Sequence, residues 1–213
     1  MCIKNLDELD KEINNRSSDN SLLVLDTGGL IEIANKAREY NLVSRGKDVN
    51  PNYMRATSFL DYISENVGII ITPKTYQEIQ DHGRMKLNGH TQELTPRIVD
   101  RSLEIMIGSE EYISGLECGL EPDQARYDAY WASKEGCNGN SKKYVEGCSE
   151  TDKEILSTVA YLSNCNVGDS SEEGRENLLV LSSDDHIILG SEFLKKNFKD
   201  RYSNIVPIST RRR

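Results

Sequence analysis

The sequence lacks the features that mark membrane, secreted and fibrous proteins. Its apolar runs, such as residues 68–71 and 178–181, are far shorter than the ~20 residues that cross a bilayer. The first twenty residues carry mixed charges and no apolar segment, so they do not form a secretory signal. Glycine (15) and proline (5) are too scarce for a disordered or collagen-like chain. We therefore expect a folded cytoplasmic protein with no membrane partner.

Paired cysteines and an excess of basic residues are also lacking. The five cysteines are odd in number and contain no C-x-x-C pair, which indicates free thiols rather than a zinc site or a disulfide framework. Asp and Glu (35) outnumber Lys and Arg (26), and the net charge is −9. Proteins that bind nucleic acid with their whole surface are normally basic. A nuclease whose acidic site is neutralised by cations is still compatible with this charge.

Four short apolar runs alternate with segments of helical periodicity. The runs span residues 22–25, 67–71, 178–181 and 205–208, and helical spacing follows each of the first three. Unbroken apolar runs of this length are typical of strands that are covered on both faces. The pattern predicts the α/β class, with a central parallel β-sheet flanked by helices.

Two segments add to this alternation. Leu6, Leu9 and Ile13 have helical spacing and predict an N-terminal helical extension over residues 1–20. Residues 21–213 would form one domain. Within it, a helical pattern and a loop rich in Gly, Asn and Lys interrupt the strand–helix order, which predicts a helical insertion at about residues 106–148.

Acidic residues recur close to the ends of the predicted strands. Asp26 follows the first strand directly, whereas Asp184 and Asp185 follow the third strand after two serines. Glu78 lies in the first turns of the helix after the second strand. Because ligands of open parallel sheets bind beyond the carboxyl ends of the strands, we expect these acids at one rim of the sheet.

Another acid, Asp152, opens a predicted helix that Ser149 or Thr151 would cap. It precedes Ile155 and Leu156 by three and four residues, so it lies on the apolar face of the helix. An acid that leans toward the core needs a basic residue, the helix N-terminus or a metal as its partner.

Four of these acids, Asp26, Glu78, Asp152 and Asp184, form a candidate catalytic and metal-binding set. Carboxylates crowded into one site raise each other's pKa, and divalent cations remove this penalty. Oxygen ligands select Mg²⁺ or Mn²⁺ rather than zinc. Asp185 is a further candidate ligand, because it could replace or assist Asp184.

Hydroxyl and imidazole groups lie near the same strand ends. Thr27 and Ser182 are predicted to orient a carboxylate or a metal-bound water, although hydroxyls at strand ends also cap helices. None of the three histidines has the spacing of zinc ligands, and no role is expected for His186.

Aromatic and basic residues gather in the predicted insertion. Tyr127, Tyr130 and Trp131 recur at three and four residues, and three lysines lie nearby: Lys134, Lys142 and Lys143. Such residues can stack on single-stranded bases and contact their phosphates. The plainer interpretation is an aromatic stripe that packs the insertion onto the domain.

The order of these motifs resembles the PIN-domain family. DTGG follows the first strand, a glutamate lies in the second helix, SETDKEIL opens a later helix and LVLSSDD ends a late strand. Asp26-Thr27 and the pair Ser182/Asp184 match the family's Asp-Ser/Thr and Ser/Thr-x-Asp. The resemblance covers residues 21 to about 209 outside the inserted middle. SETDKEIL, with SSDDH downstream, is most similar to the branch that includes ribosomal-RNA processing nucleases.

The resemblance implies a fold, an activity and partners. It implies a three-layer PIN-like domain and a metal-dependent nuclease that uses Asp26, Glu78, Asp152 and Asp184 with Mg²⁺ or Mn²⁺. Most known members cleave RNA, so single-stranded RNA is the expected substrate, cut to leave a 5′-phosphate. A homodimer and an antitoxin-like inhibitory partner protein are left open.

Other functions share parts of this pattern. Asp26-Thr27-Gly28 matches the Asp-Thr-Gly of aspartic proteases, but these need two such acids in a largely β fold. Haloacid-type phosphatases need an aspartate where Gly28 stands, and receiver domains need a lysine at a late strand end. The alternative from another class is a catalytically silent PIN-like module that binds RNA or protein.

Overall fold

The computed structural model describes residues 3, 5–18, 21–43, 52–82, 96–116, 120–138, 149–165 and 177–210. Within these residues, four strands form one sheet, with the order β2-β1-β3-β4 and every pair parallel. The strands are β1 (Leu22–Leu25), β2 (Gly68–Ile70), β3 (Leu178–Ser182) and β4 (Ile205–Ser209). Each bound lies within one residue of the predicted run, which confirms the predicted parallel sheet.

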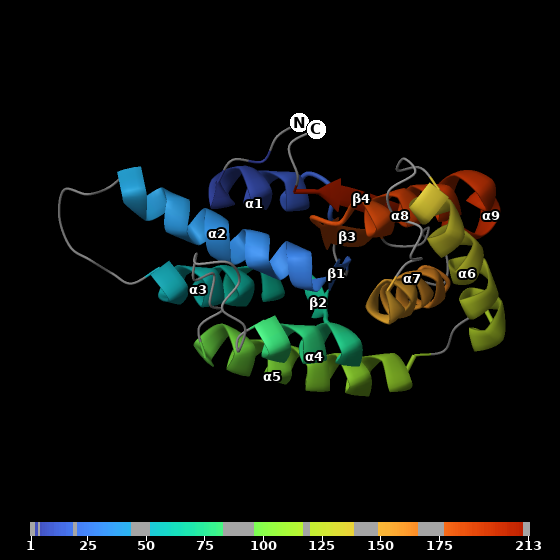
Figure 1. Cartoon of the computed structure of the whole chain (residues 1–213), viewed down its shortest axis with the longest axis horizontal. Helices are drawn as coiled ribbons and strands as arrows, with labels where there is room; N and C mark the ends of the chain where they lie inside the picture. The colour runs from blue at the N-terminus through green and yellow to red at the C-terminus, as the bar shows by residue number, and fades with distance from the viewer. Residues whose placement is uncertain are drawn as a thin grey trace.

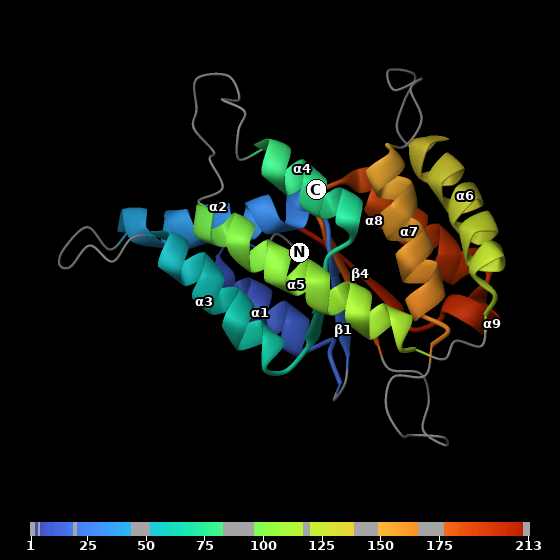
Figure 2. The same ribbon diagram turned by 90° about the horizontal axis from the view of Figure 1, so that it is seen from below.

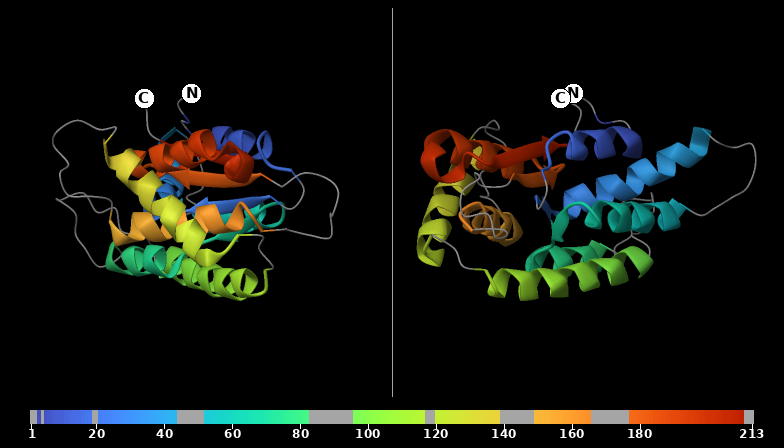
Figure 3. Two further views of the ribbon diagram at one scale, coloured as in Figure 1. Left: turned by 90° about the vertical axis from the view of Figure 1, so that its right-hand side faces the viewer. Right: turned by 180° about the vertical axis from the view of Figure 1, so that it is seen from behind.

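Helices cover both faces of the sheet, so the protein has three layers (Figures 1 and 3). The first face carries α1 (Leu6–Asn14), α2 (Thr27–Val43), α3 (Asn52–Ser64), α4 (Pro73–His82) and α5 (Pro96–Ser114). The second face carries α6 (Pro122–Asn138), α7 (Glu150–Leu162), α8 (Asp185–Asn197) and α9 (Lys199–Tyr202). This arrangement confirms the predicted α/β class.

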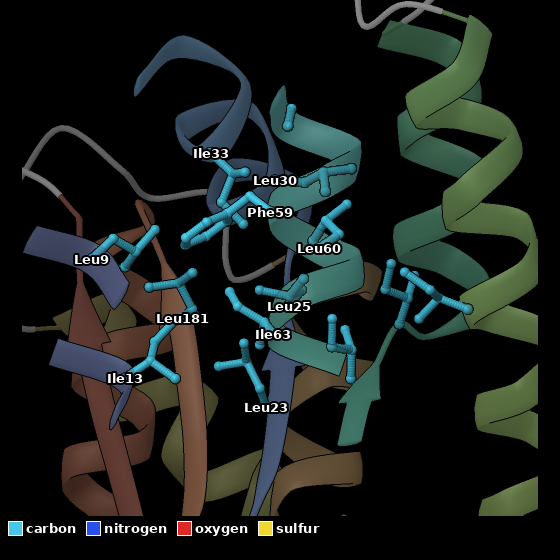
Figure 4. Close-up of a cluster of buried hydrophobic side chains, with 14 of the residues drawn as sticks. Leu9, Ile13, Leu23, Leu25, Leu30, Ile33, Phe59, Leu60, Ile63 and Leu181 are labelled. Atoms are coloured by element: carbon cyan, nitrogen blue, oxygen red, sulfur yellow. The ribbon is translucent and has the colours of Figure 1, made fainter. Parts of the chain in front are cut away.

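The strands bury side chains on both faces, which is why their sequences do not alternate. Leu23 and Leu25 point into the first core, with side chains of α1, α2 and α3 around them (Figure 4). Leu22 and Val24 point into the second core, toward α7 and α8. Successive strand side chains face opposite sides, so a strand covered twice must be apolar throughout.

The predicted N-terminal extension and the helix in which the predicted insertion starts both pack into the first core of the domain. In α1, Leu9 and Ile13 are at most 1 % exposed and belong to the first core. Residue 106, the predicted start of the insertion, lies inside α5, and Ile98 and Ile105 of this helix belong to the same core. Ser109 of α5 also accepts the Ile71 N–H on its Oγ at 3.1 Å, at the edge of β2. Thus α5 covers the open edge of the sheet, and a boundary at residue 106 would divide it.

Two further expectations concern the cysteines and the membrane. Cys165 is disulfide-bonded, so the expectation of free thiols is wrong at this residue. Among the described helices, none combines the length and the apolar character that a bilayer crossing requires.

Candidate functional site

Asp26 lies at the carboxyl end of β1, where the register of the sheet determines its neighbour. Leu25 pairs with Leu181, so the next residue, Asp26, lies beside Ser182 of β3. Ser182 donates from Oγ to Asp26 Oδ2 at 2.6 Å, and the Gly29 N–H donates to Asp26 Oδ1. Asp26 is only 5 % exposed. The predicted role of Ser182 in orienting a carboxylate is therefore visible in its contacts.

The two glycines after Asp26 allow α2 to begin directly against β3. A Cβ on Gly29 would lie 2.5 Å from the Leu181 carbonyl oxygen and 2.9 Å from Asp26 Oδ1. Such approaches do not occur between real atoms, and the obstacle at Leu181 is backbone that cannot rotate away. The sequence DTGG is thus needed to bring the start of α2 against the acid at the end of β1.

Asp152 reaches the same rim from the first turn of α7. It forms a capping box with Ser149, in which Asp152 Oδ2 accepts the Ser149 N–H at 2.9 Å and Ser149 Oγ accepts the Asp152 N–H at 3.1 Å. Of the two predicted caps, Ser149 is the one used. The acid is 8 % exposed, which confirms that it faces the core. Its Oδ1 accepts no hydrogen bond from a described residue.

Asp184 caps α8 on the other side of Ser182. Its Oδ1 accepts the His186 N–H at 2.7 Å, and its own N–H donates to Ser182 Oγ at 2.7 Å. Ser182 therefore joins Asp26 and Asp184 through one hydroxyl. Asp185, the alternative ligand, is the first residue of α8, and among the described residues the candidate metal group contains Asp184 instead.

His186 is a member of the site that the sequence did not reveal. One ligand atom each from Asp152, Asp184 and His186 lie within 4.8 Å of one another. The His186 Nδ1 lies 3.6 Å from Asp184 Oδ1. The only local signal was the position of His186 two residues after a helix-capping aspartate, which places it in the first turn of α8.

Glu78 is held by Thr27, the residue that follows Asp26. Thr27 donates from Oγ1 to Glu78 Oε2 at 2.8 Å, which ties α4 to the first residue of α2. Glu154 of α7 accepts the Lys74 backbone N–H at 2.9 Å, so α4 and α7 are joined near the same rim (Figure 2). Asp26, Asp152 and Asp184 therefore come close together at one end of the sheet, and Glu78 is linked to this end through Thr27.

Burial and mutual repulsion raise the pKa values of the inner acids. The pKa of Asp26 is raised to about 7, mainly because burial removes water contact; the charges of Asp184 and Asp152 also raise this pKa, whereas the hydrogen bonds from Ser182 and Gly29 lower it. Burial likewise raises the pKa of Asp152, and the charge of Asp184 adds to this effect. Ionising all these acids at neutral pH is therefore unfavourable without a cation.

The donor groups are suited to a divalent cation. Within the described part of the chain, no lysine or arginine forms an ion pair with Asp26, Glu78, Asp152 or Asp184. Carboxylate oxygens are the ligands that Mg²⁺ and Mn²⁺ prefer, and Asp152 still has one oxygen without a hydrogen-bond donor. A cation at this rim would supply the positive charge that the described side chains do not.

The aromatic row on α6 is exposed, so the interpretation that it packs the segment onto the domain is wrong. Tyr127, Tyr130 and Trp131 are 57 %, 47 % and 40 % exposed. At 100° per residue, these positions lie opposite the face that α6 buries. The buried face includes three alanines of the second core: Ala125, Ala129 and Ala132.

The exposed row carries a cation of its own. Lys134 Nζ lies 4.5 Å from the centre of the Tyr130 ring and 5.3 Å from that of Trp131. The other predicted basic residues, Lys142 and Lys143, lie outside the described residues. Helix α6 packs against α7 and α8, which supply Asp152 and Asp184 (Figure 2). The aromatic row therefore lies on a helix that packs against the two helices beginning at these acids.

No family model matches this chain, and no curated protein or solved structure is significantly similar to it. The resemblance to PIN domains thus stays a prediction from the motifs.

Proposed function

We propose that this protein is a PIN-like, metal-dependent endoribonuclease that hydrolyses phosphodiester bonds of single-stranded RNA. Asp26, Glu78, Asp152 and Asp184 would surround Mg²⁺ or Mn²⁺ at the rim of the sheet. One observation carries the proposal. Three distant segments bring Asp26, Asp152 and Asp184 together so closely that neighbouring charges raise the pKa values of Asp26 and Asp152, while no described lysine or arginine pairs with them.

The chain's own groups would orient the reaction. Divalent ions, when bound, supply positive charge that activates water and stabilises the oxygens of a phosphodiester displacement. Ser182 fixes Asp26 from one side and the Gly29 N–H fixes it from the other, so neither carboxylate oxygen is free to rotate. Thr27 holds Glu78 in the same way. These contacts fix the acids without adding positive charge, because the donors are neutral hydroxyl and amide groups.

Tyr130 and Trp131 are the proposed RNA-contacting residues on α6. Single-stranded bases stack on exposed aromatic rings, and a nearby ammonium group attracts the phosphates. Lys134 supplies that group within the described residues, and Lys142 and Lys143 are proposed to continue it. A local patch of this kind offsets the net charge of −9, which would otherwise repel RNA.

A cleavage assay with labelled single-stranded RNA tests the proposal. We expect cleavage with Mn²⁺ or Mg²⁺, no cleavage with EDTA, and a loss of at least about 100-fold for Asp26→Asn. Glu150→Gln is the matched control, because Glu150 opens the same helix as Asp152 but its side chain is 70 % exposed and pairs with Lys153. This variant should cleave like the wild type.

Two outcomes would contradict the nuclease. Intact RNA across a broad substrate panel, with RNA binding retained, would favour the catalytically silent binding module. Equal cleavage by wild type and Asp26→Asn would identify a contaminating nuclease.

A further inference from the structure

His186 reaches the acidic rim from the first turn of α8. Its backbone N–H donates to Asp184 Oδ1 at 2.7 Å, and its Nδ1 lies 3.6 Å from the same oxygen. The ring is largely covered, with 18 % of the side chain exposed. The imidazole therefore lies close to the carboxyl groups of both Asp152 and Asp184.

The three ligand atoms have the dimensions of a single coordination sphere. Metal–ligand bonds of about 2.1 Å place two ligands about 3.0 Å apart when adjacent and about 4.2 Å apart when opposite. The atoms of Asp152, Asp184 and His186 lie within 4.8 Å of one another. Small side-chain rotations therefore suffice to bring all three onto one ion.

Each aspartate still has an oxygen available for such an ion. Asp152 uses Oδ2 for the capping box with Ser149, and Asp184 uses Oδ1 for the cap of α8. Their other oxygens accept no hydrogen bond from the described residues. The caps also fix the direction of both carboxylates, as outer hydrogen bonds do for metal ligands.

We propose that His186 is a ligand of the ion held by Asp152 and Asp184, and that its imidazole makes this site select Mn²⁺ over Mg²⁺. The inference rests on the proposed metal site and adds a nitrogen ligand to the oxygen ligands of its acids.

The selectivity follows from the chemistry of the donors. Mg²⁺ is a hard ion that keeps its waters and prefers oxygen ligands. Imidazole nitrogen favours transition metals, in an affinity order that begins with Mn²⁺ and rises toward Cu²⁺. Replacing one oxygen by nitrogen therefore costs Mg²⁺ more than Mn²⁺. The carboxylates keep the site acceptable to Mn²⁺, which binds oxygen and nitrogen together.

Electron paramagnetic resonance of bound Mn²⁺ tests this ligand directly, without any activity measurement. A coordinated imidazole gives nitrogen-14 modulation in the electron spin echo of Mn²⁺, and an oxygen ligand gives none. We expect this modulation in the wild-type protein and its loss in His186→Gln, which replaces the imidazole by an amide. Its absence from the wild type, or its persistence in His186→Gln, would overturn the inference.

Metal affinities measured by calorimetry provide the second test. We expect His186→Gln to lose Mn²⁺ affinity by at least the roughly 10- to 100-fold that outer-shell changes cost, and to change Mg²⁺ affinity by less than about threefold. Glu150→Gln is the matched control, since this acid of α7 is 70 % exposed and pairs with Lys153. A larger loss of Mn²⁺ affinity in Glu150→Gln than in His186→Gln would overturn the assignment.

The results separate this inference from the proposed nuclease. Metal-dependent cleavage by a wild-type protein whose Mn²⁺ shows no nitrogen modulation overturns the inference alone. Nitrogen-coupled Mn²⁺ with intact RNA overturns the nuclease and supports the inference. Failure to bind either ion overturns both.

Discussion

Replacing Asp26 by asparagine should stabilise the protein at neutral pH when no metal is bound. The Asp26 carboxyl is 5 % exposed, and burial raises its pKa from 3.8 to about 7. Asparagine has the same shape: its oxygen can accept the Gly29 N–H and its amide can donate to Ser182. Because the variant cannot ionise, it avoids the cost of placing a charge beside Asp152 and Asp184.

The sign and size of the effect follow from the pKa difference between the folded and unfolded states. A carboxyl with a raised folded pKa is neutral in both states below pH 3.8, and its destabilising effect grows as the pH rises to about 7. At 1.36 kcal/mol for each tenfold change, the full effect is about 4 kcal/mol. Between pH 5 and pH 8, the free energy of unfolding of the wild type should fall by roughly 2.5 kcal/mol more than that of Asp26→Asn.

Urea unfolding in EDTA at several pH values measures this difference. The free energies of unfolding of the two proteins should converge near pH 4 and separate toward pH 8, with the variant more stable. Adding Mn²⁺ at about 100 times its Kd should return about 2.7 kcal/mol to the wild type. The reasoning would be refuted if the free energy of unfolding of the wild type, relative to that of the variant, stayed constant or rose from pH 5 to pH 8. Asp26 would then not be a buried carboxyl crowded by other acids.

Three further substitutions test other parts of the structure. Gly29→Ala should lower the free energy of unfolding by about 1–3 kcal/mol through overpacking against β3, whereas Gly108→Ala, with open space around it, should raise it by about 0.5–1 kcal/mol in the same urea assay. Trp131→Ala should weaken single-stranded RNA binding roughly tenfold in fluorescence anisotropy, and unchanged affinity would exclude stacking on the only tryptophan. Asp128→Ala should cost about 3 kcal/mol, because this 1 % exposed acid accepts from a hydroxyl and a guanidinium of α9. Removal of the exposed Asp123, measured by thermal unfolding alongside it, should cost less than about 0.5 kcal/mol.

The sequence was sufficient for the strands and for the direction of Asp152. The strands were recognisable because burial on both faces requires unbroken apolar runs. Asp152 was recognisable because its spacing from Ile155 and Leu156 places it on the buried face of α7. Both properties depend only on local periodicity, which a single sequence contains.

Features that depend on distant contacts could not be predicted in this way. Helices α3 and α5 each follow another helix without a strand between them, so the alternation of strands and helices did not predict them. Ser109 of α5 looks like a polar residue within a helix, and its contact with Ile71, the residue after β2, joins residues 38 apart in the chain. His186 could not be recognised as a candidate ligand from its own segment, because its neighbour Asp152 belongs to the distant helix α7. The aromatic row was misread because periodicity defines a helix face without saying which face is buried.

Neutral hydroxyl groups, rather than basic side chains, hold the acids of the rim in place. Ser182 lies between Asp26 and Asp184, and Thr27 lies between Asp26 and Glu78, so neutral donors hold acids from different segments in place. Lysine or arginine at these positions would neutralise the carboxylates and remove the repulsion between them. Selection for stability alone would favour lysine or arginine at these positions, because ionisation of the buried Asp26 at neutral pH lowers the free energy of unfolding. Retaining neutral donors leaves the charge available for a cation, which is the arrangement that a metal-dependent site requires.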